Sequence, residues 1–351
     1  MNGNYQQNLQ INNFQTPHFD PKNQEKIEEK RAFKNAVSIA AAMTLTYYIL
    51  ANTLPQYFST IFDFPQFTYI SSQLFGDETL LRLIFITLGE LLSFLIPVFI
   101  MVFVLKQGAP FFALAKTKAT NFNLPLILMT FGIIFVTNVL ANASNYVLSW
   151  FHIVVPDRSF DHPGTIPWII FMIIYTAIIP AVFEELLFRG AIMGSLRRYG
   201  DGVAILVSSI LFALAHQHLT AALNAFLVGI ILGYFIVRTG SLRAGMYMHF
   251  FYNFSIIILT ELQRYAQSTI LIWNKIAQIF LYLFVPVSML LAIIGLLMFI
   301  KRTKQPFKIL DKNNFIPFYE KISIACTNPV MVIVVSLYSF IIVTGILGIN
   351  L

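Results

Sequence analysis

Charged residues are scarce in this chain, and this scarcity excludes an ordinary soluble protein. Of the 351 residues, only 11% are Asp, Glu, Lys or Arg, whereas 57% are hydrophobic. Soluble domains carry about 25% charged residues, so the composition is typical of a protein with many membrane-spanning helices. The net charge of +7 does not indicate nucleic acid, because the basic residues lie between apolar runs, where they orient helices. We expect the lipid bilayer, and no nucleic acid, as a partner.

Several other common features are missing. Cys326 is the single cysteine, which excludes an internal disulfide framework and a zinc site built from cysteines. The polar first thirty residues lack the apolar segment of a cleavable signal peptide. The chain contains no P-loop, no dinucleotide-binding glycine motif in a strand–helix context, no HExxH zinc motif and no internal repeat of roughly 20–50 residues.

Apolar runs predict how the chain is organised. Residues 1–31 are predicted to form a polar cytoplasmic tail, and residues 32–351 a transmembrane helical domain. Each run can cross or nearly cross a hydrocarbon core about 30 Å thick at ~1.5 Å per residue. The sequence therefore predicts an all-α, polytopic membrane helix bundle of about nine transmembrane helices, at residues 33–54, 79–105, 124–148, 166–188, 203–217, 221–238, 243–261, 276–300 and 327–350.

The distribution of Lys and Arg predicts the orientation of this bundle. With the N-terminus inside, 19 of the 23 basic residues fall in the inner segments and 4 in the outer ones. Cytoplasmic loops are enriched in Lys and Arg. We therefore expect a multi-pass protein of the cell membrane with its N-terminus inside and its C-terminus outside.

A group of charges lies at the end of the span 166–188. Glu185 and Arg189 are four residues apart, so on a helix they share a face and can pair. Glu184 lies about 100° round the helix from Glu185 and is free to point elsewhere. Ionisable residues in a membrane usually face a protein interior or a wet cavity and mark function. The alternative is a structural ion pair at the membrane interface.

Two histidine motifs follow on later spans. Phe212 and His216 are four residues apart, and a polar turn around Gly200 lies 16 residues after Glu184 and 16 before His216. If two antiparallel helices meet at that turn, Glu184 and His216 lie at the same depth, as the activation of a water molecule requires. The alternative is an interfacial histidine at a helix end.

His249 and Asn253 share one face of the span 243–261. Both can donate hydrogen bonds, which suits the stabilisation of a developing oxyanion. The alternative is a structural role, because Asn and His also form hydrogen bonds between membrane helices. Glu90, within the second span, is a weaker candidate that either supports the site or makes a structural hydrogen bond.

Together these motifs resemble a known family. E-E-x-x-x-R at 184–189, F-x-x-x-H at 212–216 and H-x-x-x-N at 249–253 look like the motifs of the CAAX protease and bacteriocin-processing family of intramembrane endopeptidases. The resemblance covers about residues 165–260, which would be the catalytic core. It implies that Glu184 is the catalytic carboxylate and that His216 is its partner on the water. It also implies an oxyanion role for His249 and Asn253, held in place by Glu185 and Arg189.

The resemblance leaves metal use open. Glu184, His216 and His249, together with Asn253, could hold a divalent ion, and Zn²⁺ with three protein ligands and a water is chemically reasonable, as in a metalloprotease. A site without a metal is equally self-consistent. There Glu184 takes the proton of the water, and His249 and Asn253 receive the carbonyl oxygen. We favour this version because it explains both donors on one helix face.

The predicted function is an endopeptidase that hydrolyses a peptide bond near the cytoplasmic membrane face. The resemblance suggests a prenylated CAAX substrate or a bacterial peptide. The chain is rich in Asn, Ile and Phe, as in AT-rich bacterial genomes, which favours a peptide or membrane-protein substrate. One alternative is a non-catalytic scaffold, regulator or bacteriocin self-immunity protein of the same fold. Another is a transporter in which Glu184 and His216 relay protons.

Overall fold

The computed structural model describes residues 21–117, 123–151, 153, 165–267, 269–303 and 315–346. Within these ranges every regular element is a helix, and no strand occurs, which confirms the predicted all-α class. The elements are α1 (Pro21–Ile61), α2 (Pro65–Phe75), α3 (Leu80–Phe99), η1 (Ile100–Val104), α4 (Gly108–Lys116), α5 (Asn123–Trp150), α6 (Ile166–Met172), η2 (Ile173–Ile178), α7 (Ile179–Glu184), η3 (Glu185–Met193), α8 (Gly194–Leu196), η4 (Arg197–Tyr199), α9 (Asp201–Leu214), α10 (Leu219–Thr239), α11 (Leu242–Ala266), α12 (Leu271–Arg302), α13 (Phe318–Cys326) and α14 (Pro329–Ile346).

Seven helices of the described chain are long and apolar enough to cross a membrane. They are Pro21–Ile61, Leu80–Val104, Leu124–Trp150, Ile166–Tyr199, Leu219–Thr239, Leu271–Arg302 and Pro329–Ile346. The other two expected spans also form helices, α9 and α11. The 14 residues of α9 rise only about 21 Å, which is less than a hydrocarbon core of about 30 Å. A polytopic helical bundle is therefore confirmed, whereas nine crossings and their orientation remain predictions.

The N-terminal boundary also stays a prediction. Helix α1 begins at Pro21, before the expected end of the polar tail at residue 31, and continues to Ile61. Residues 1–20 lie outside the described part of the chain.

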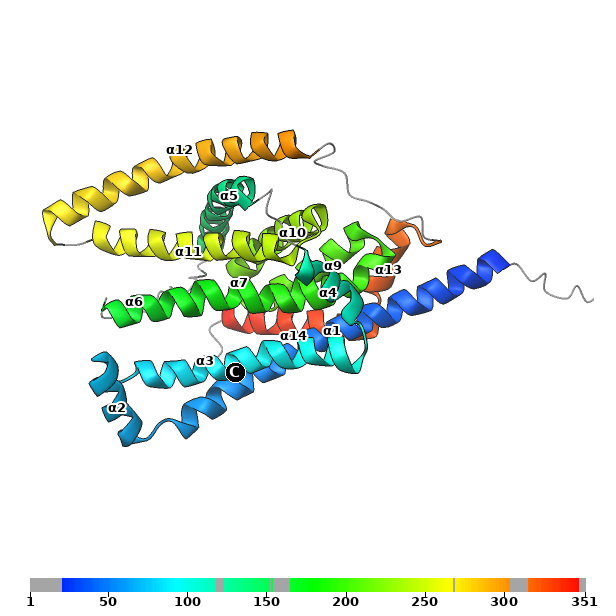
Figure 1. Cartoon of the computed structure of the whole chain (residues 1–351), viewed down its shortest axis with the longest axis horizontal. Coiled ribbons are helices and arrows are strands. Elements are labelled where there is room, and N and C mark those ends of the chain that lie inside the picture. The colour runs from blue at the N-terminus through cyan, green and yellow to red at the C-terminus, as the bar shows by residue number, and fades with distance from the viewer. Residues whose placement is uncertain are drawn as a thin grey trace, which may run out of the picture.

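Several predicted inner segments meet at one end of the bundle (Figure 1). The ammonium group of Lys321 in α13 donates a hydrogen bond of 2.6 Å to the carbonyl oxygen of Tyr199 in η4. The hydroxyl of Ser241, just before α11, donates to the carbonyl oxygen of Thr117, just after α4. These contacts join segments that are far apart in the sequence, and they place the predicted inner segments on a common side.

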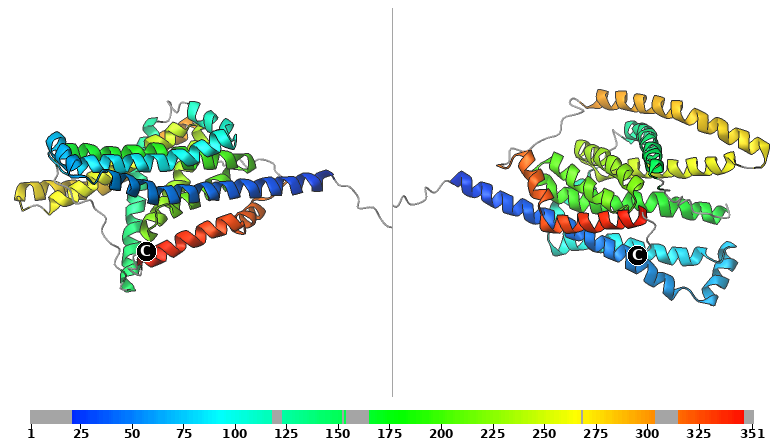
Figure 2. Two further views of the ribbon diagram at one scale, coloured as in Figure 1. Left: turned by 90° about the horizontal axis from the view of Figure 1, so that it is seen from below. Right: turned by 180° about the vertical axis from the view of Figure 1, so that it is seen from behind.

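The largest hydrophobic cluster surrounds η3 and α9. It combines buried residues of α1, α3, η3, α9 and α14, among them Phe33, Phe94, Phe188, Phe212 and Tyr338. Helix α5 instead runs steeply across α11 and α12 on one side of the molecule (Figure 2). The core therefore lies where the predicted charged motif and the first histidine motif meet.

The helical segment from Ile166 to Tyr199 becomes π-helical twice. The π-helical turn η2 directly precedes Ile179 and Pro180, and the longer π-helical segment η3 starts at Glu185. Pro180 has no N–H group, so it cannot donate to the carbonyl oxygen of Thr176 as an α-helix requires. π-helical turns are rare and occur frequently at functional sites. Here they flank Glu184, the residue that the sequence selects as the catalytic carboxylate.

Candidate active site

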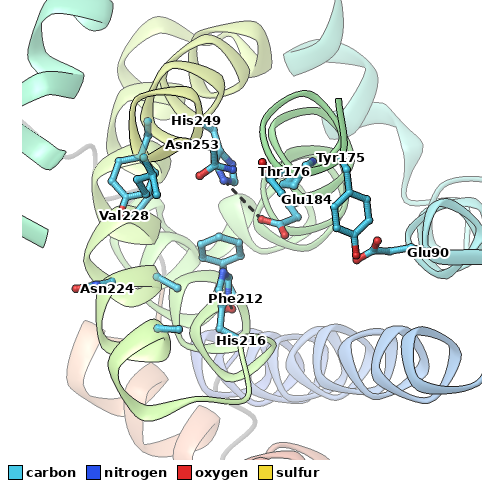
Figure 3. A pocket seen from close by; sticks show the side chains of 15 residues that line it. Glu90, Tyr175, Thr176, Glu184, Phe212, His216, Asn224, Val228, His249 and Asn253 are labelled. Atoms are coloured by element: carbon cyan, nitrogen blue, oxygen red, sulfur yellow. Dashed lines mark hydrogen bonds and ion pairs between the residues drawn. The ribbon is translucent and has the colours of Figure 1, made fainter. Parts of the chain in front are cut away.

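Four residues predicted for the site line one cavity. The cavity has a volume of about 390 Å³ and lies between α3, the helical segment 166–199, α9, α10 and α11. Figure 3 shows Glu184, His216, His249 and Asn253 around it. The lining residues are Glu90, Tyr175, Thr176, Pro180, Glu184, Phe212, His216, Ala221, Asn224, Ala225, Val228, His249, Tyr252, Asn253 and Ile256.

Glu185 and Arg189 pair beneath this cavity, as their spacing predicts. The Nη1 atom of Arg189 donates a hydrogen bond of 2.8 Å to Oε1 of Glu185, and both side chains are fully buried. Removing one partner of a buried ion pair leaves an uncompensated charge, so the two residues depend on each other. The pair is therefore part of the folded core and does not lie at an exposed membrane interface.

The same carboxylate also holds His249. The Nδ1 atom of His249 lies 3.0 Å from Oε1 of Glu185, although the two residues are 64 positions apart. Since a carboxylate oxygen accepts, Nδ1 carries the shared hydrogen and the other ring nitrogen is left to face Glu184. The Nε2 atom of His249 is 3.6 Å from Oε2 of Glu184. The contacts of Arg189 with Glu185 and of Glu185 with His249 thus hold one edge of the imidazole in place. Figure 3 shows the other edge facing Glu184, the predicted catalytic carboxylate.

Gly245 makes this contact possible. A Cβ atom at position 245 would lie 3.0 Å from Oε2 of Glu185 and would also collide with the side chain of Ile236. Without a side chain at this position, α11 can approach η3 closely, as small residues allow between membrane helices. The site residue His249 lies one helical turn further along α11. The sequence alone does not reveal this role of Gly245, because an isolated glycine in a helix does not indicate what it packs against.

His216 lies beyond the end of α9, which ends at Leu214. Its Nδ1 atom is 2.9 Å from the carbonyl oxygen of Phe212. A carbonyl oxygen only accepts, so Nδ1 donates and Nε2 is the ring nitrogen left for other partners. A helix end and its turn are tolerated at membrane depth only inside the protein or beside a water-filled cavity. The short length of α9 therefore places His216 at the cavity.

Phe212 is the aromatic centre of the site. The guanidinium carbon of Arg189 lies 4.0 Å from the centroid of its ring. Its ring also contacts the imidazoles of His216 and His249 edge-on, at centroid distances of 4.8 and 6.1 Å. Phe212 therefore separates the buried cation from the cavity and positions both histidines.

Asn253 lines the cavity one helical turn after His249. Its neighbour Tyr252 donates a hydrogen bond of 3.2 Å to Oγ1 of Thr137 in α5, which fixes this part of α11. Tyr175, Thr176, Asn224 and Tyr252 also line the cavity, although no sequence motif predicts them there. Single polar residues in apolar runs give no sequence signal that separates cavity lining from hydrogen bonds between helices.

The described residues do not fit a metal centre. No three His, Cys, Asp or Glu side chains in these parts of the chain are grouped so that they could hold one ion. A zinc site of this kind needs three protein ligands at about 2.0–2.2 Å from the metal. Glu184, His216 and His249 share the cavity without forming such a group, and the metalloprotease interpretation is not supported.

Comparisons with known proteins agree with this geometry. Residues 166–255 match the model of the Rce1-like family, described as type II CAAX prenyl endopeptidase Rce1-like. The match runs from α6 into α11 and confirms the predicted family resemblance. At the family level, it supports a CAAX-type protease embedded in the membrane. Neither the curated proteins nor the solved structures gave a match.

Proposed function

We propose that this chain is an intramembrane endopeptidase in which Glu184 and His216 activate a water molecule. One observation carries the proposal: Glu184, His216, His249 and Asn253, which come from three separate helical segments, line a single cavity. A purely structural role, as ion pairs or as hydrogen bonds between helices, does not require these side chains to line a common cavity. The activation of a nucleophile and the stabilisation of an oxyanion do require it.

The roles follow from which atoms are already engaged. The Nδ1 atoms of His216 and His249 have protein acceptors, so only their Nε2 atoms are available for the reaction. Glu184 removes a proton from the water, with Nε2 of His216 as the second acceptor that orients it. The resulting hydroxide attacks the carbonyl carbon of the substrate.

The developing oxyanion lies on the other side of the site. The amide group of Asn253 donates one hydrogen bond to it, and Nε2 of His249 donates another when this nitrogen carries a hydrogen. Glu184 lies 3.6 Å from that nitrogen. After the attack, the protonated Glu184 donates to the leaving amine, which completes hydrolysis without a second acid.

The substrate class follows from the surroundings of the cavity. The match region lies within apolar helices, so a substrate must reach the site through the bilayer or along its surface. We propose a peptide or a membrane protein whose cleaved bond lies close to the cytoplasmic face. The family description names prenylated CAAX substrates, and farnesylated peptides should therefore be tested beside unmodified ones.

The decisive experiment compares two matched carboxylate variants. Glu184→Gln keeps the shape of the side chain but removes its base, whereas Glu261→Gln alters a carboxylate outside the cavity, where Arg264 is its partner at 2.7 Å. Single-turnover cleavage of peptides should disappear with Glu184→Gln and persist with Glu261→Gln. Near wild-type cleavage by Glu184→Gln would refute the hydrolase and favour the scaffold.

A further inference from the structure

The cavity has a second carboxylate that the proposed reaction does not use. Glu90 lines it from α3 and is the only ionisable residue between Arg82 and Lys106. A charge in the middle of a membrane helix usually faces the protein interior and marks a substrate or ion path. Glu90 also lies outside residues 166–255, so the match to the Rce1-like family does not account for it.

Two features hold Glu90 in position. Its carboxylate is hydrogen-bonded to the hydroxyl of Tyr175, and Figure 3 shows the ring of Tyr175 between Glu90 and the helix that carries Glu184. A Cβ atom on the preceding Gly89 would lie 2.8 Å from the backbone of Leu54 and Pro55, so α3 packs directly against α1 at this level. The orientation of Glu90 is therefore fixed by the bundle.

The charges around the cavity are unbalanced. Among its lining residues in the described chain are two carboxylates, Glu90 and Glu184, and neither Lys nor Arg. The nearby cation, Arg189, is fully buried, binds Glu185 and is covered by Phe212. A free carboxylate at the end of a peptide would find no Lys or Arg side chain among these lining residues. A buried carboxylate instead favours a positively charged partner.

We propose that Glu90, oriented by Tyr175, forms a subsite for a Lys or Arg side chain of the substrate, a few residues from the bond that is cleaved. Tyr175 precedes Glu184 by nine residues, which corresponds to about 13 Å along a helix at ~1.5 Å per residue. An extended peptide advances ~3.3 Å per residue, so a few substrate residues span this distance. Lys and Arg are concentrated at the cytoplasmic ends of membrane helices, so such a segment of a membrane protein provides the required charge. This inference rests on the proposed function, because it places a substrate in the same cavity.

The test uses a set of Leu- and Ala-rich peptides that are identical except for one Lys, Gln or Glu, placed in turn at each position. Their dissociation constants are measured for Glu184→Gln in nanodiscs, and their cleavage is measured with the wild-type chain. At one substituted position, we expect the Lys peptide to bind at least about tenfold more tightly than the Glu peptide, as for a desolvated charge pair. Adding Glu90→Gln should abolish this ratio, and adding Glu90→Lys should reverse it.

Each protein serves as its own control, because the ratio between two peptides does not depend on the yield of a variant. Adding Glu261→Gln, outside the cavity, should leave the ratio unchanged. An equal Lys-to-Glu ratio with and without Glu90→Gln would refute the subsite, even if the peptides are cleaved. A Lys preference that depends on Glu90, without cleavage by the wild-type chain, would support the subsite and refute the proposed hydrolysis.

Discussion

Helices α12 and η3 differ in how much of their surface the protein covers. Helix α12 belongs to the most apolar of the candidate spans, yet only 4 of its 32 residues are buried. The π-helical segment η3 carries Glu185 and Arg189, and 8 of its 9 residues are buried. Lipid chains are as apolar as Leu, so apolar side chains gain little by leaving the bilayer, whereas charged groups require protein partners. In this membrane protein, the most apolar span is largely uncovered by protein, whereas the segment with the buried ion pair is almost fully covered.

The first prediction concerns which helices cross the membrane at all. If α9 and α11 cross together with α12 and the other six long helices, the turn at Gly240 lies in the cytoplasm. If only the seven long apolar helices cross, the same turn lies outside. We expect a reporter fused after Gly240 to be cytoplasmic and one fused after Leu351 to be outside, because 19 of 23 basic residues are then inside. If the reporter fused after Gly240 is instead found outside the cell, then α9 and α11 do not cross the membrane.

The largest kinetic effect is expected at Glu184 and His216. Each alanine variant should lose nearly all turnover, and the double variant should be little worse than either single one, because residues that act as a unit have non-additive effects. The measurement is single-turnover cleavage of a cognate peptide. If the loss of turnover in the double variant equals the product of the losses in the two single variants, the two residues act independently.

A smaller kinetic effect is expected at Asn253. Asn253→Ala removes one of two proposed donors to the oxyanion, and such a loss lowers turnover by about 10²–10³. Residual activity should therefore be measurable where Glu184→Ala shows none. Full activity of Asn253→Ala would assign this residue to packing between helices.

The difference between buried and exposed charges can be measured with two arginines. Arg189 is fully buried and binds Glu185, whereas Arg264 is 45% exposed and binds Glu261 at 2.7 Å. Arg189→Ala should lower the free energy of unfolding by about 3–5 kcal/mol, because it removes the cation that pairs with a buried carboxylate. Arg264→Ala should lower it by about 0.2–1 kcal/mol, as exposed pairs do. Thermal unfolding of both variants in one detergent gives the comparison, and equal losses would contradict it.

The smallest effect is expected at Asp77, near the start of α3. Its carboxylate accepts hydrogen bonds from the hydroxyl and backbone N–H of Thr79, from the backbone N–H of Leu80, and, at 2.7 Å, from the indole of Trp168 in α6. Partial burial raises the pKa of Asp77, but these hydrogen bonds outweigh it and lower the pKa below its usual value. Asp77→Ala should cost about 1 kcal/mol, as the loss of a helix cap does.

This contribution should depend on pH. Because the folded pKa of Asp77 is the lower one, its stabilising effect is present above the unfolded pKa of about 3.9 and is lost as the pH falls through the folded pKa. The melting temperatures of wild type and Asp77→Ala should therefore converge in acid. A constant difference across this pH range would exclude the ionised carboxylate as the cause.

The sequence by itself determined the helical class, and it identified Glu184, His216, His249 and Asn253 as candidate site residues, all of which line the cavity. Hydropathy locates apolar helices, and a spacing of four residues places Glu185 beside Arg189 within one helix. The equal distances of Glu184 and His216 from Gly200 predicted a common depth for the two side chains, and both line the cavity. These features depend on local geometry, which follows directly from the order of residues.

Only the tertiary structure decided how the helices share their polar groups. The contact between Glu185 and His249 joins residues 64 positions apart and depends on how closely α11 packs at Gly245. The contact of Tyr175 with Glu90 likewise depends on how α3 lies against the helical segment 166–199. Periodicity fixes directions within one helix but not the rotation and distance between two. In lipid, those are set by close packing and hydrogen bonds, which appear only once the helices have met.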